Sequence, residues 1–305
     1  MIGQSNQCNG GAPMIKLGCN SLVKDRDNPG GWIDIEAMID LIHTLRLDMI
    51  DFQLDRGFRS LEPAYLRRIK ILCHKYGLPI GFIGAGSGFV GTAQSPDGSV
   101  VGASLSPEEL QQRIDVVKEA VDVAVFMGAP LIRLFGGGVP EATENREAVW
   151  STMISGFQAV SDYAAEKGIL IGLHNHPPAV EPTSDDILRI LNDVDRENFT
   201  FILDTGRWRG APTSREETSD SSENIYKYME QTAPYASYVR AKIYKVDSGR
   251  EELLDYRRIV DILKKVNFNG NMSIVFEDQG NQCGYAEAIE LAVKHLRGLL
   301  AESEE

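Results

Sequence analysis

Short apolar runs and stretches with helical periodicity alternate eight times along the chain. A short apolar run is typical of a buried strand, and apolar residues spaced by three and four positions are typical of an amphipathic helix. Leu66, Ile69 and Cys73, for example, fall on one face of a helical stretch. The pattern predicts strands at 16–19, 49–53, 79–83, 131–135, 170–174, 199–203, 238–243 and 272–276, and helices at 33–46, 63–76, 107–127, 144–167, 184–194, 222–233, 256–266 and 285–300.

Capping signals mark the ends of several predicted helices. Ser106 stands before a proline at the first helical position, and Thr183 stands before acidic residues that the positive end of a helix favours. Gly77, Gly128 and Gly168 follow predicted helices, where a left-handed C-cap favours glycine. These signals agree with the boundaries that the apolar pattern indicates.

Strands that alternate with helices form a mostly parallel sheet. Eight such units predict a single α/β domain, a (β/α)8 TIM barrel over residues 14–305, after a flexible N-terminal extension at residues 1–13. The alternative is an open Rossmann-like sheet, but no Gly-X-Gly-X-X-Gly follows the first strand. The longest irregular stretch, residues 84–105, is rich in Gly and Ser and is a candidate mobile lid over the barrel mouth.

Charge and composition restrict the partners. The 305-residue chain carries a net charge of −13, and an acidic surface disfavours nucleic acids and anionic membranes. No apolar run approaches transmembrane length, the N-terminus lacks the features of a signal peptide, and the four cysteines lack CxxC spacing. We expect a cytoplasmic protein that binds a small-molecule carbohydrate, with no nucleic-acid or membrane partner. A homo-oligomer is compatible with these observations.

Polar residues gather where the predicted strands end, and this end of a parallel barrel carries the active site. Two apolar strands lead into the carboxylates Asp204 and Glu277, and a third leads into His174 and His176. Oxygen and nitrogen donors of this kind bind divalent cations. Other candidates for substrate binding at the strand ends are Asn20, Gln53, Arg133, Arg207, Trp208, Arg240 and Lys242.

Each of these residues also has an interpretation without function. Asp204 precedes Thr-Gly and is suited to capping a turn. Glu277 is placed to form an ion pair with Arg240 on the neighbouring strand, and the two histidines are compatible with hydrogen-bonded core positions. Arg207 suits a solvated loop, and Trp208 suits packing as well as a sugar platform at the mouth.

Five motifs at the strand ends resemble those of a known family. They are KLGCN at 16–20, GLHNH at 172–176, LDTG at 203–206, YVRAK at 238–242 and SIVFE at 273–277. In this order the chain resembles the xylose isomerase-like TIM barrels, the sugar phosphate isomerase/epimerase superfamily, over nearly its whole length. The resemblance implies a divalent metal (Mn²⁺, Mg²⁺, Co²⁺ or Zn²⁺) held by a Glu, an Asp, a His and a second Glu from strands five to eight.

The metal ligands of the family carry over only in part. Asp204 and Glu277 match two of them, whereas His174 stands where the first Glu is usual and Arg240 where the His is usual. Arginine has no lone pair to give to a metal. His174, Asp204 and Glu277, with or without His176, therefore form the candidate metal site. Alternatively, Arg240 and Lys242 replace the metal and neutralise the carboxylates or an anionic substrate.

The resemblance implies a sugar or sugar-derivative isomerase or epimerase that transfers a proton next to a carbonyl. Glu277 is the candidate base, and His174 the candidate second proton carrier because imidazole titrates near neutrality. The metal, or Arg240 with Lys242, polarises the carbonyl. One alternative is a lyase on a keto-sugar or keto-glycoside using the same base. Another is a non-catalytic carbohydrate-binding barrel with a degenerate metal site.

Overall fold

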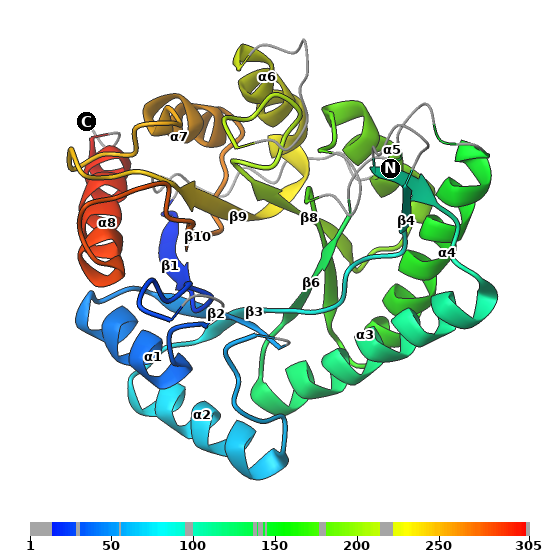
Figure 1. Cartoon of the computed structure of the whole chain (residues 1–305), viewed down its shortest axis with the longest axis horizontal. Coiled ribbons are helices and arrows are strands. Elements are labelled where there is room, and N and C mark those ends of the chain that lie inside the picture. The colour runs from blue at the N-terminus through cyan, green and yellow to red at the C-terminus, as the bar shows by residue number, and fades with distance from the viewer. Residues whose placement is uncertain are drawn as a thin grey trace.

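A computed structural model describes residues 14–28, 31–54, 56–94, 100–136, 139, 143, 145–176, 181–213 and 222–302. The expected N-terminal extension at residues 1–13 lies outside the described residues. Within them, parallel strands close into a barrel that helices surround (Figure 1). The TIM barrel that the sequence predicts is therefore confirmed.

The barrel closes because the first strand pairs on both sides. In order around the barrel, the strands are β1 (Lys16–Asn20), β10 (Asn271–Phe276), β9 (Ala236–Ile243), β8 (Phe199–Asp204), β7 (Leu170–His174), β6 (Leu131–Phe135), β3 (Ile80–Gly84) and β2 (Met49–Gln53). Strand β1 is parallel to both β10 and β2, so the sheet has no free edge. The open-sheet alternative was wrong for this reason.

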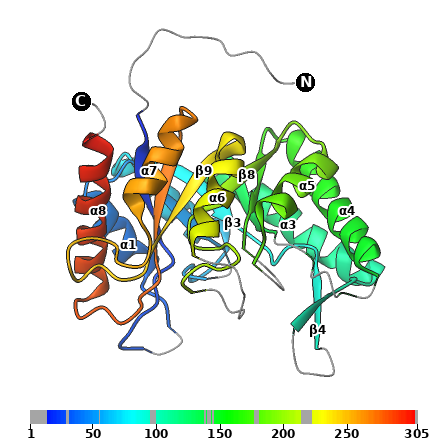
Figure 2. The ribbon, with the colours of Figure 1, turned by 90° about the horizontal axis from the view of Figure 1, so that it is seen from above.

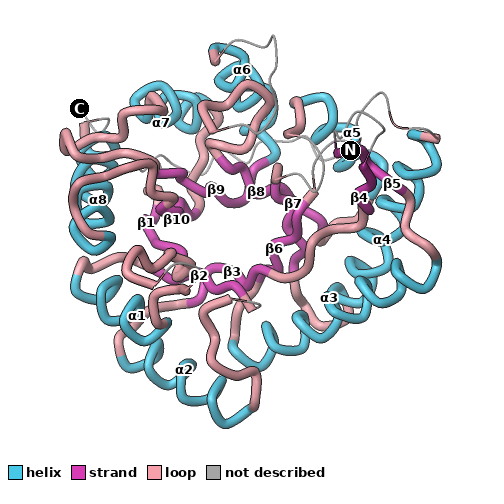
Figure 3. Tube along the Cα trace, in the orientation of Figure 1, coloured by secondary structure: helices cyan, strands magenta, loops and turns pink. Residues whose placement is uncertain are grey.

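Helices form the outer layer, outside the ring of strands (Figure 3). They are α1 (Ile35–Thr44), α2 (Pro63–Lys75), α3 (Pro107–Met127), α4 (Arg146–Ala165), α5 (Ser184–Val194), α6 (Glu223–Thr232), α7 (Tyr256–Lys265) and α8 (Tyr285–Ala301), with a short 3₁₀ turn η1 (Ala233–Tyr235) before β9. Each lies within one of the stretches that the apolar periodicity indicated, to within a few residues at either end. No helix among the described residues is both long enough and apolar enough to span a membrane.

Helix α3 begins and ends as its sequence indicates. Ser106 accepts a hydrogen bond from the backbone N–H of Glu109, whose carboxylate accepts one from the N–H of Ser106. The helix ends at Gly128, whose φ of 84° is the left-handed C-cap conformation that favours glycine.

Replacing Ser106 by alanine is expected to reduce the free energy of unfolding by about 1 kcal/mol, because an N–H at the start of α3 loses its acceptor. Urea unfolding followed by circular dichroism measures this change. Ser151→Ala on α4 is a matched control, since its hydroxyl only bonds back to a carbonyl within its own helix. Equal effects of both substitutions would contradict the capping role.

Alternation along the strands separates two apolar layers. Val239, Ala241 and Ile243 of β9 pack in the large core between strands and helices. Tyr238 of the same strand belongs to a second, smaller cluster inside the barrel, whose other members are Met49, Phe82, Leu131 and Ile202. Arg240 and Lys242 share the parity of Tyr238, so they continue into the barrel lumen above this apolar floor.

The candidate lid is partly regular. Within residues 84–105, β4 (Gly91–Gln94) and β5 (Val100–Ala103) form an antiparallel pair, which extends at the end of the barrel opposite the C-terminus (Figure 2). The expectation of a wholly irregular stretch was wrong. The two strands were missed because each is only four residues long and a glycine interrupts or begins it, although Pro96-Asp97-Gly98 between them in the sequence is a turn signal.

Candidate active site

A cavity of about 490 Å³ lies across the carboxyl ends of the barrel strands. Side chains after β8, on β9 and at the end of β10 (Arg207, Arg240 and Glu277) form one part of its wall. The full lining is Leu22, Val23, Lys24, Trp32, Arg56, Phe135, His176, Arg207, Thr213, Arg240, Val275, Phe276, Glu277, Asp278 and Gln279. We call it the mouth cavity.

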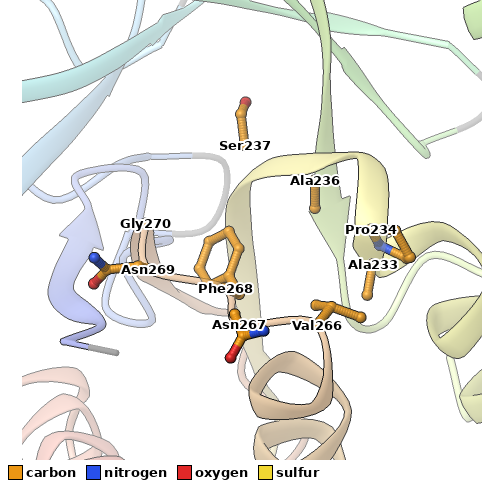
Figure 4. A pocket seen from close by; sticks show the side chains of 9 residues that line it. All are labelled: Ala233, Pro234, Ala236, Ser237, Val266, Asn267, Phe268, Asn269 and Gly270. Atoms are coloured by element: carbon orange, nitrogen blue, oxygen red, sulfur yellow. The ribbon is translucent and has the colours of Figure 1, made fainter. Parts of the chain in front are cut away.

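A second cavity, of about 280 Å³, lies at the other end of the barrel. It surrounds the start of β9 at Ala236 and Ser237 and the segment 266–270 that leads into β10 (Figure 4). None of its lining side chains is ionisable. It therefore offers no acid–base chemistry, whereas the mouth cavity lies at the carboxyl ends of the strands, where parallel barrels carry their active sites.

Asp204 ends β8 as a fully buried carboxylate with three partners on neighbouring strands. Its Oδ2 lies 2.9 Å from His174 Nε2, 3.2 Å from Arg240 Nε and 3.8 Å from Lys242 Nζ. Its Oδ1 accepts a hydrogen bond of 3.0 Å from the N–H of Gly206. The two oxygens of Asp204 thus have different surroundings: Oδ1 caps the turn, as one interpretation predicted, and Oδ2 faces the charged groups of the candidate site.

Glu277 directly follows β10 at the mouth, and its side chain is about a third exposed. It accepts a hydrogen bond from Lys242 and two from Arg207, whose Nη2 lies 2.8 Å and 3.1 Å from its two oxygens. Arg207 Nη1 also lies 3.6 Å from Glu181. The partners of Glu277 therefore differ from the Arg240 expected for the structural interpretation, since Arg240 pairs with Asp204 instead.

The cations keep both carboxylates ionised. Burial raises the pKa of Asp204, but Lys242, Arg240 and Arg207 together hold it below the ordinary value. The pKa of Glu277 falls to about 2, because Lys242 and Arg207 outweigh the effect of its burial. Burial in turn lowers the pKa of Lys242, since the ammonium group has left water.

His174 is a neutral imidazole in this environment. It is fully buried, and burial together with the charges of Arg240 and Arg133 lowers its pKa well below the ordinary value. With Asp204 ionised, the hydrogen on Nε2 donates to Asp204. The expectation that His174 titrates near neutrality was wrong, because the nearby positive charges and the loss of water both oppose protonation.

The donor set does not fit a divalent metal. Among the described residues, no group of three or more His, Cys, Asp and Glu side chains is arranged to hold one. The Lys242 ammonium lies between Asp204 and Glu277, and Arg240 contacts Asp204 from the adjacent strand. Fixed positive charges thus stand where the predicted ligands His174, Asp204 and Glu277 would have to meet a cation.

Below the mouth, a buried carboxylate that sequence reasoning left without a role sits in the lumen. Asp51 of β2 accepts hydrogen bonds of 2.6 Å from Tyr238 OH and 3.2 Å from the N–H of Phe82. Gly81 leaves room for this pair, because a Cβ there would come within 2.5 Å of both oxygens. Burial raises the pKa of Asp51 to about 6, although Ser273 and Tyr238 stabilise its charged form.

Asp51→Asn is expected to change how stability depends on pH. The pKa rises from 3.8 to about 6 on folding, so the folded protein holds a proton that the unfolded chain has lost between these values. Stability is therefore lost as pH rises from about 4 through about 6, by roughly 3 kcal/mol in the limit. Because other groups titrate in the same interval, the effect is measured as a difference: between pH 4 and pH 7, urea unfolding should show the wild type losing roughly 3 kcal/mol more stability than the variant. An identical pH dependence would contradict the buried ionisation.

The other predicted residues differ in whether they reach the mouth cavity. His176, Arg207 and Arg240 line the mouth cavity, whereas Asn20 and Lys242 are buried at the strand ends without lining it.

Gln53 and Arg133 are also buried at the strand ends, and they bond to each other. Trp208 is fully buried against Phe201 and Tyr228 in the outer core, so the expectation that it stands at the mouth was wrong. Sequence reasoning missed Lys24, Trp32, Arg56, Thr213 and Glu181, although all of them follow barrel strands, which is the signal that finds such residues.

Residues 39–298 match the family described as xylose isomerase-like TIM barrel. The chain belongs to this family. Among curated proteins, it is similar to an inosose dehydratase of Geobacillus thermodenitrificans (strain NG80-2), with 33% identity over 60 residues. The matched segment is only 20% of each chain.

Solved structures of this family share the fold at low identity. A D-tagatose 3-epimerase-like protein has a TM-score of 0.68 and 19% identity, over 94% of this chain and 97% of that one. A xylose isomerase domain protein from Planctomyces limnophilus has 0.68 and 17%, over 95% and 99%. The 3-keto-D-glucoside 4-epimerase from E. coli has 0.67 and 14%, over 93% and 99%. These likenesses concern the fold.

Proposed function

We propose that the protein is an enzyme that removes a proton from the carbon next to the carbonyl of a keto-sugar, without using a divalent metal for this step. The observation that carries the proposal is the Lys242 ammonium between the carboxylates of Asp204 and Glu277 at the barrel mouth. A base and a cationic hydrogen-bond donor side by side are what enolate formation requires. The family and its sugar epimerase neighbours support a carbohydrate substrate.

Each residue has one role in the proposed step. Glu277 accepts the proton from carbon, and the electron pair of the broken C–H bond forms the C=C bond of an enediolate. Lys242, buried behind Glu277, stabilises by its positive charge the oxygen on which negative charge develops, with Arg240 beside it. Asp204 positions Lys242, Arg240 and the neutral His174 and is itself too enclosed to touch substrate.

Substrate binding must also activate Glu277. A carboxylate with a pKa of about 2 is a weak base near neutrality. Its pKa is low because Lys242 and Arg207 donate to it. When a substrate oxygen takes the donor of Arg207, which lines the cavity, the stabilisation of the carboxylate weakens and its affinity for a proton rises. The resting ion pairs thus hold the base inactive until the site is filled.

Returning the proton to the adjacent carbon gives isomerisation, and returning it to the opposite face of the same carbon gives epimerisation. Two-sided transfer needs a second proton carrier, and neutral His174, bonded to Asp204, is poorly placed for it. The second candidate function is therefore a lyase, in which the enediolate expels a group from the next carbon. The segment similar to an inosose dehydratase supports this alternative.

Solvent deuterium tests the proton abstraction that both functions share. The protein, treated with EDTA, is incubated in D₂O with a panel of ketoses, keto-glycosides and keto-sugar acids, and the products are examined by NMR. We expect deuterium at the carbon next to the carbonyl in at least one compound, and none with protein denatured by heat. An unsaturated product in place of a labelled isomer would identify the lyase. Absence of exchange across the panel, both after EDTA treatment and with added Mn²⁺, Mg²⁺, Co²⁺ or Zn²⁺, would support a carbohydrate-binding barrel instead.

A further inference from the structure

The wall of the mouth cavity is positively charged although the whole chain carries −13. Four of its lining residues are Lys or Arg, namely Lys24, Arg56, Arg207 and Arg240, and two are acidic, Glu277 and Asp278. Asp278 already pairs with Arg26 at 2.5 Å. A local excess of positive charge in an acidic protein favours an anionic ligand at this place.

Two arginines of the wall retain unused donors. Arg207 and Arg240 are each more than nine-tenths buried. Among the described residues, Arg207 Nε and Arg240 Nη1 have no hydrogen-bond partner. Arg240 gives its Nε to Asp204, and its Nη1 is left for another acceptor. A buried donor without a partner destabilises the unliganded protein, so a ligand that supplies an acceptor is favoured.

In the segments after β9 and β10, backbone N–H groups that could bind a phosphate already donate to carboxylates. In many TIM barrels these two loops supply the backbone N–H groups that bind a phosphate. Here the N–H groups of Tyr244, Lys245 and Leu253 donate to the buried carboxylate of Glu251. The N–H of Gln282 likewise donates to Asp247. A phosphate in these loops would therefore meet carboxylates in place of free donors.

We propose that the mouth cavity binds a sugar acid: a polyhydroxy ketone whose carboxylate is held by the guanidinium groups of Arg207 and Arg240. The planar guanidinium matches the two oxygens of a carboxylate. This assignment rests on the proposed function for the keto group, and it adds the carboxylate. A carboxylate on Arg207 also competes with Glu277 for the same nitrogen, Nη2, which frees the proposed base.

Binding of matched ligands tests the assignment. Isothermal titration calorimetry at low salt compares 2-keto-D-gluconate and 5-keto-D-gluconate with D-fructose and D-fructose 6-phosphate. We expect at least one keto acid to bind at least tenfold more tightly than the neutral ketose and the phosphate. The advantage over D-fructose should shrink severalfold in 0.5 M NaCl. Equal binding of keto acid and D-fructose, tighter binding of the phosphate, or binding of no keto acid would overturn the proposal.

Two variants locate the bound carboxylate. Arg240→Lys keeps the charge but loses the planar pair of donors, so we expect keto-acid binding to weaken at least tenfold and D-fructose binding to change less than threefold. Arg257→Gln, on the exposed face of α7, is the control and should bind as the wild type does. If Arg240→Lys does not fold, Arg56→Gln at the rim replaces it, with an expected threefold weakening for the keto acid alone. Unchanged keto-acid binding in the variant tested would overturn the assignment.

The outcomes separate this inference from the proposed function. Deuterium exchange into a neutral ketose, without preference for keto acids, leaves the function standing and removes the sugar acid. Selective binding of a keto acid without exchange into any compound leaves the anion site standing and removes the proton-transfer step.

Discussion

Replacing Glu277 by glutamine is expected to lower the rate of deuterium exchange into the keto-sugar substrate by about 10²- to 10⁴-fold, the usual contribution of a positioned general base. Glutamine keeps the shape, and its one carbonyl oxygen, in the place of Oε1, still accepts from Lys242 and Arg207, but it cannot take a proton from carbon. The initial rate of label incorporation, at saturating and at low substrate, measures the effect. The loss should appear mainly in kcat, because substrate contacts remain.

Glu147→Gln is the matched control for this substitution. Glu147 is an exposed carboxylate of α4 that pairs with Arg189, also by two hydrogen bonds, and has no contact with the mouth cavity. It should exchange deuterium at the wild-type rate. If Glu277→Gln retains more than a tenth of the wild-type rate while its unfolding curve is unchanged, another group is the base.

Lys242→Met is expected to lower kcat by about 10²- to 10³-fold, because it removes a positive charge that stabilises the developing oxyanion. Methionine is of similar length and apolar, so it fills the same space without the positive charge. Asp204 keeps Arg240 and Glu277 keeps Arg207, which leaves neither carboxylate without a cation. Circular dichroism and urea unfolding check that the barrel is retained.

Deuterium exchange by the wild-type protein also tests whether the reaction needs a divalent metal. Because Lys242 supplies the positive charge, EDTA should leave wild-type exchange unchanged, and Mn²⁺ should not shift its Tm. Loss of wild-type activity in EDTA that Mn²⁺, Mg²⁺, Co²⁺ or Zn²⁺ restores would contradict the role of Lys242. Activity of Lys242→Met that remains near wild type would contradict it as well.

The two substitutions are coupled through one network. Asp204, Glu277, Lys242, Arg207 and Arg240 form a continuous set of ion pairs across the ends of β8, β9 and β10. Groups that share partners do not act additively. The double variant should therefore be only slightly slower than the slower of the two single variants.

The fold followed from the sequence because its signals are local and repeated. Each strand candidate is a short apolar run and each helix candidate an amphipathic stretch. Eight strand–helix units, each indicated by its own local pattern, therefore predicted the same barrel. The apolar pattern did not predict the hairpin of β4 and β5. This hairpin pairs two short segments with each other through backbone hydrogen bonds, which leave little trace in the apolar pattern.

The position of the site also followed from the sequence, since carboxyl strand ends meet at one mouth in every parallel barrel. Asp204 and Glu277 were found in this way, at the ends of two apolar strands. The same rule wrongly placed Trp208 at the mouth. A residue after a strand can turn back into the layer under the helices, and its direction depends on packing against Phe201 and Tyr228.

The sequence by itself determined the barrel, the mouth and the two carboxylates, and it left open whether His174 and Arg240 rebuild a metal site or replace it. Tertiary structure decided which charges meet. Parallel pairing of β8, β9 and β10 brings the buried nitrogens of Arg240 and Lys242 to Asp204, and it brings Lys242 to Glu277. Their pKa values and partners depend on burial and on distances of a few ångströms between separate strands, which no spacing along the chain encodes.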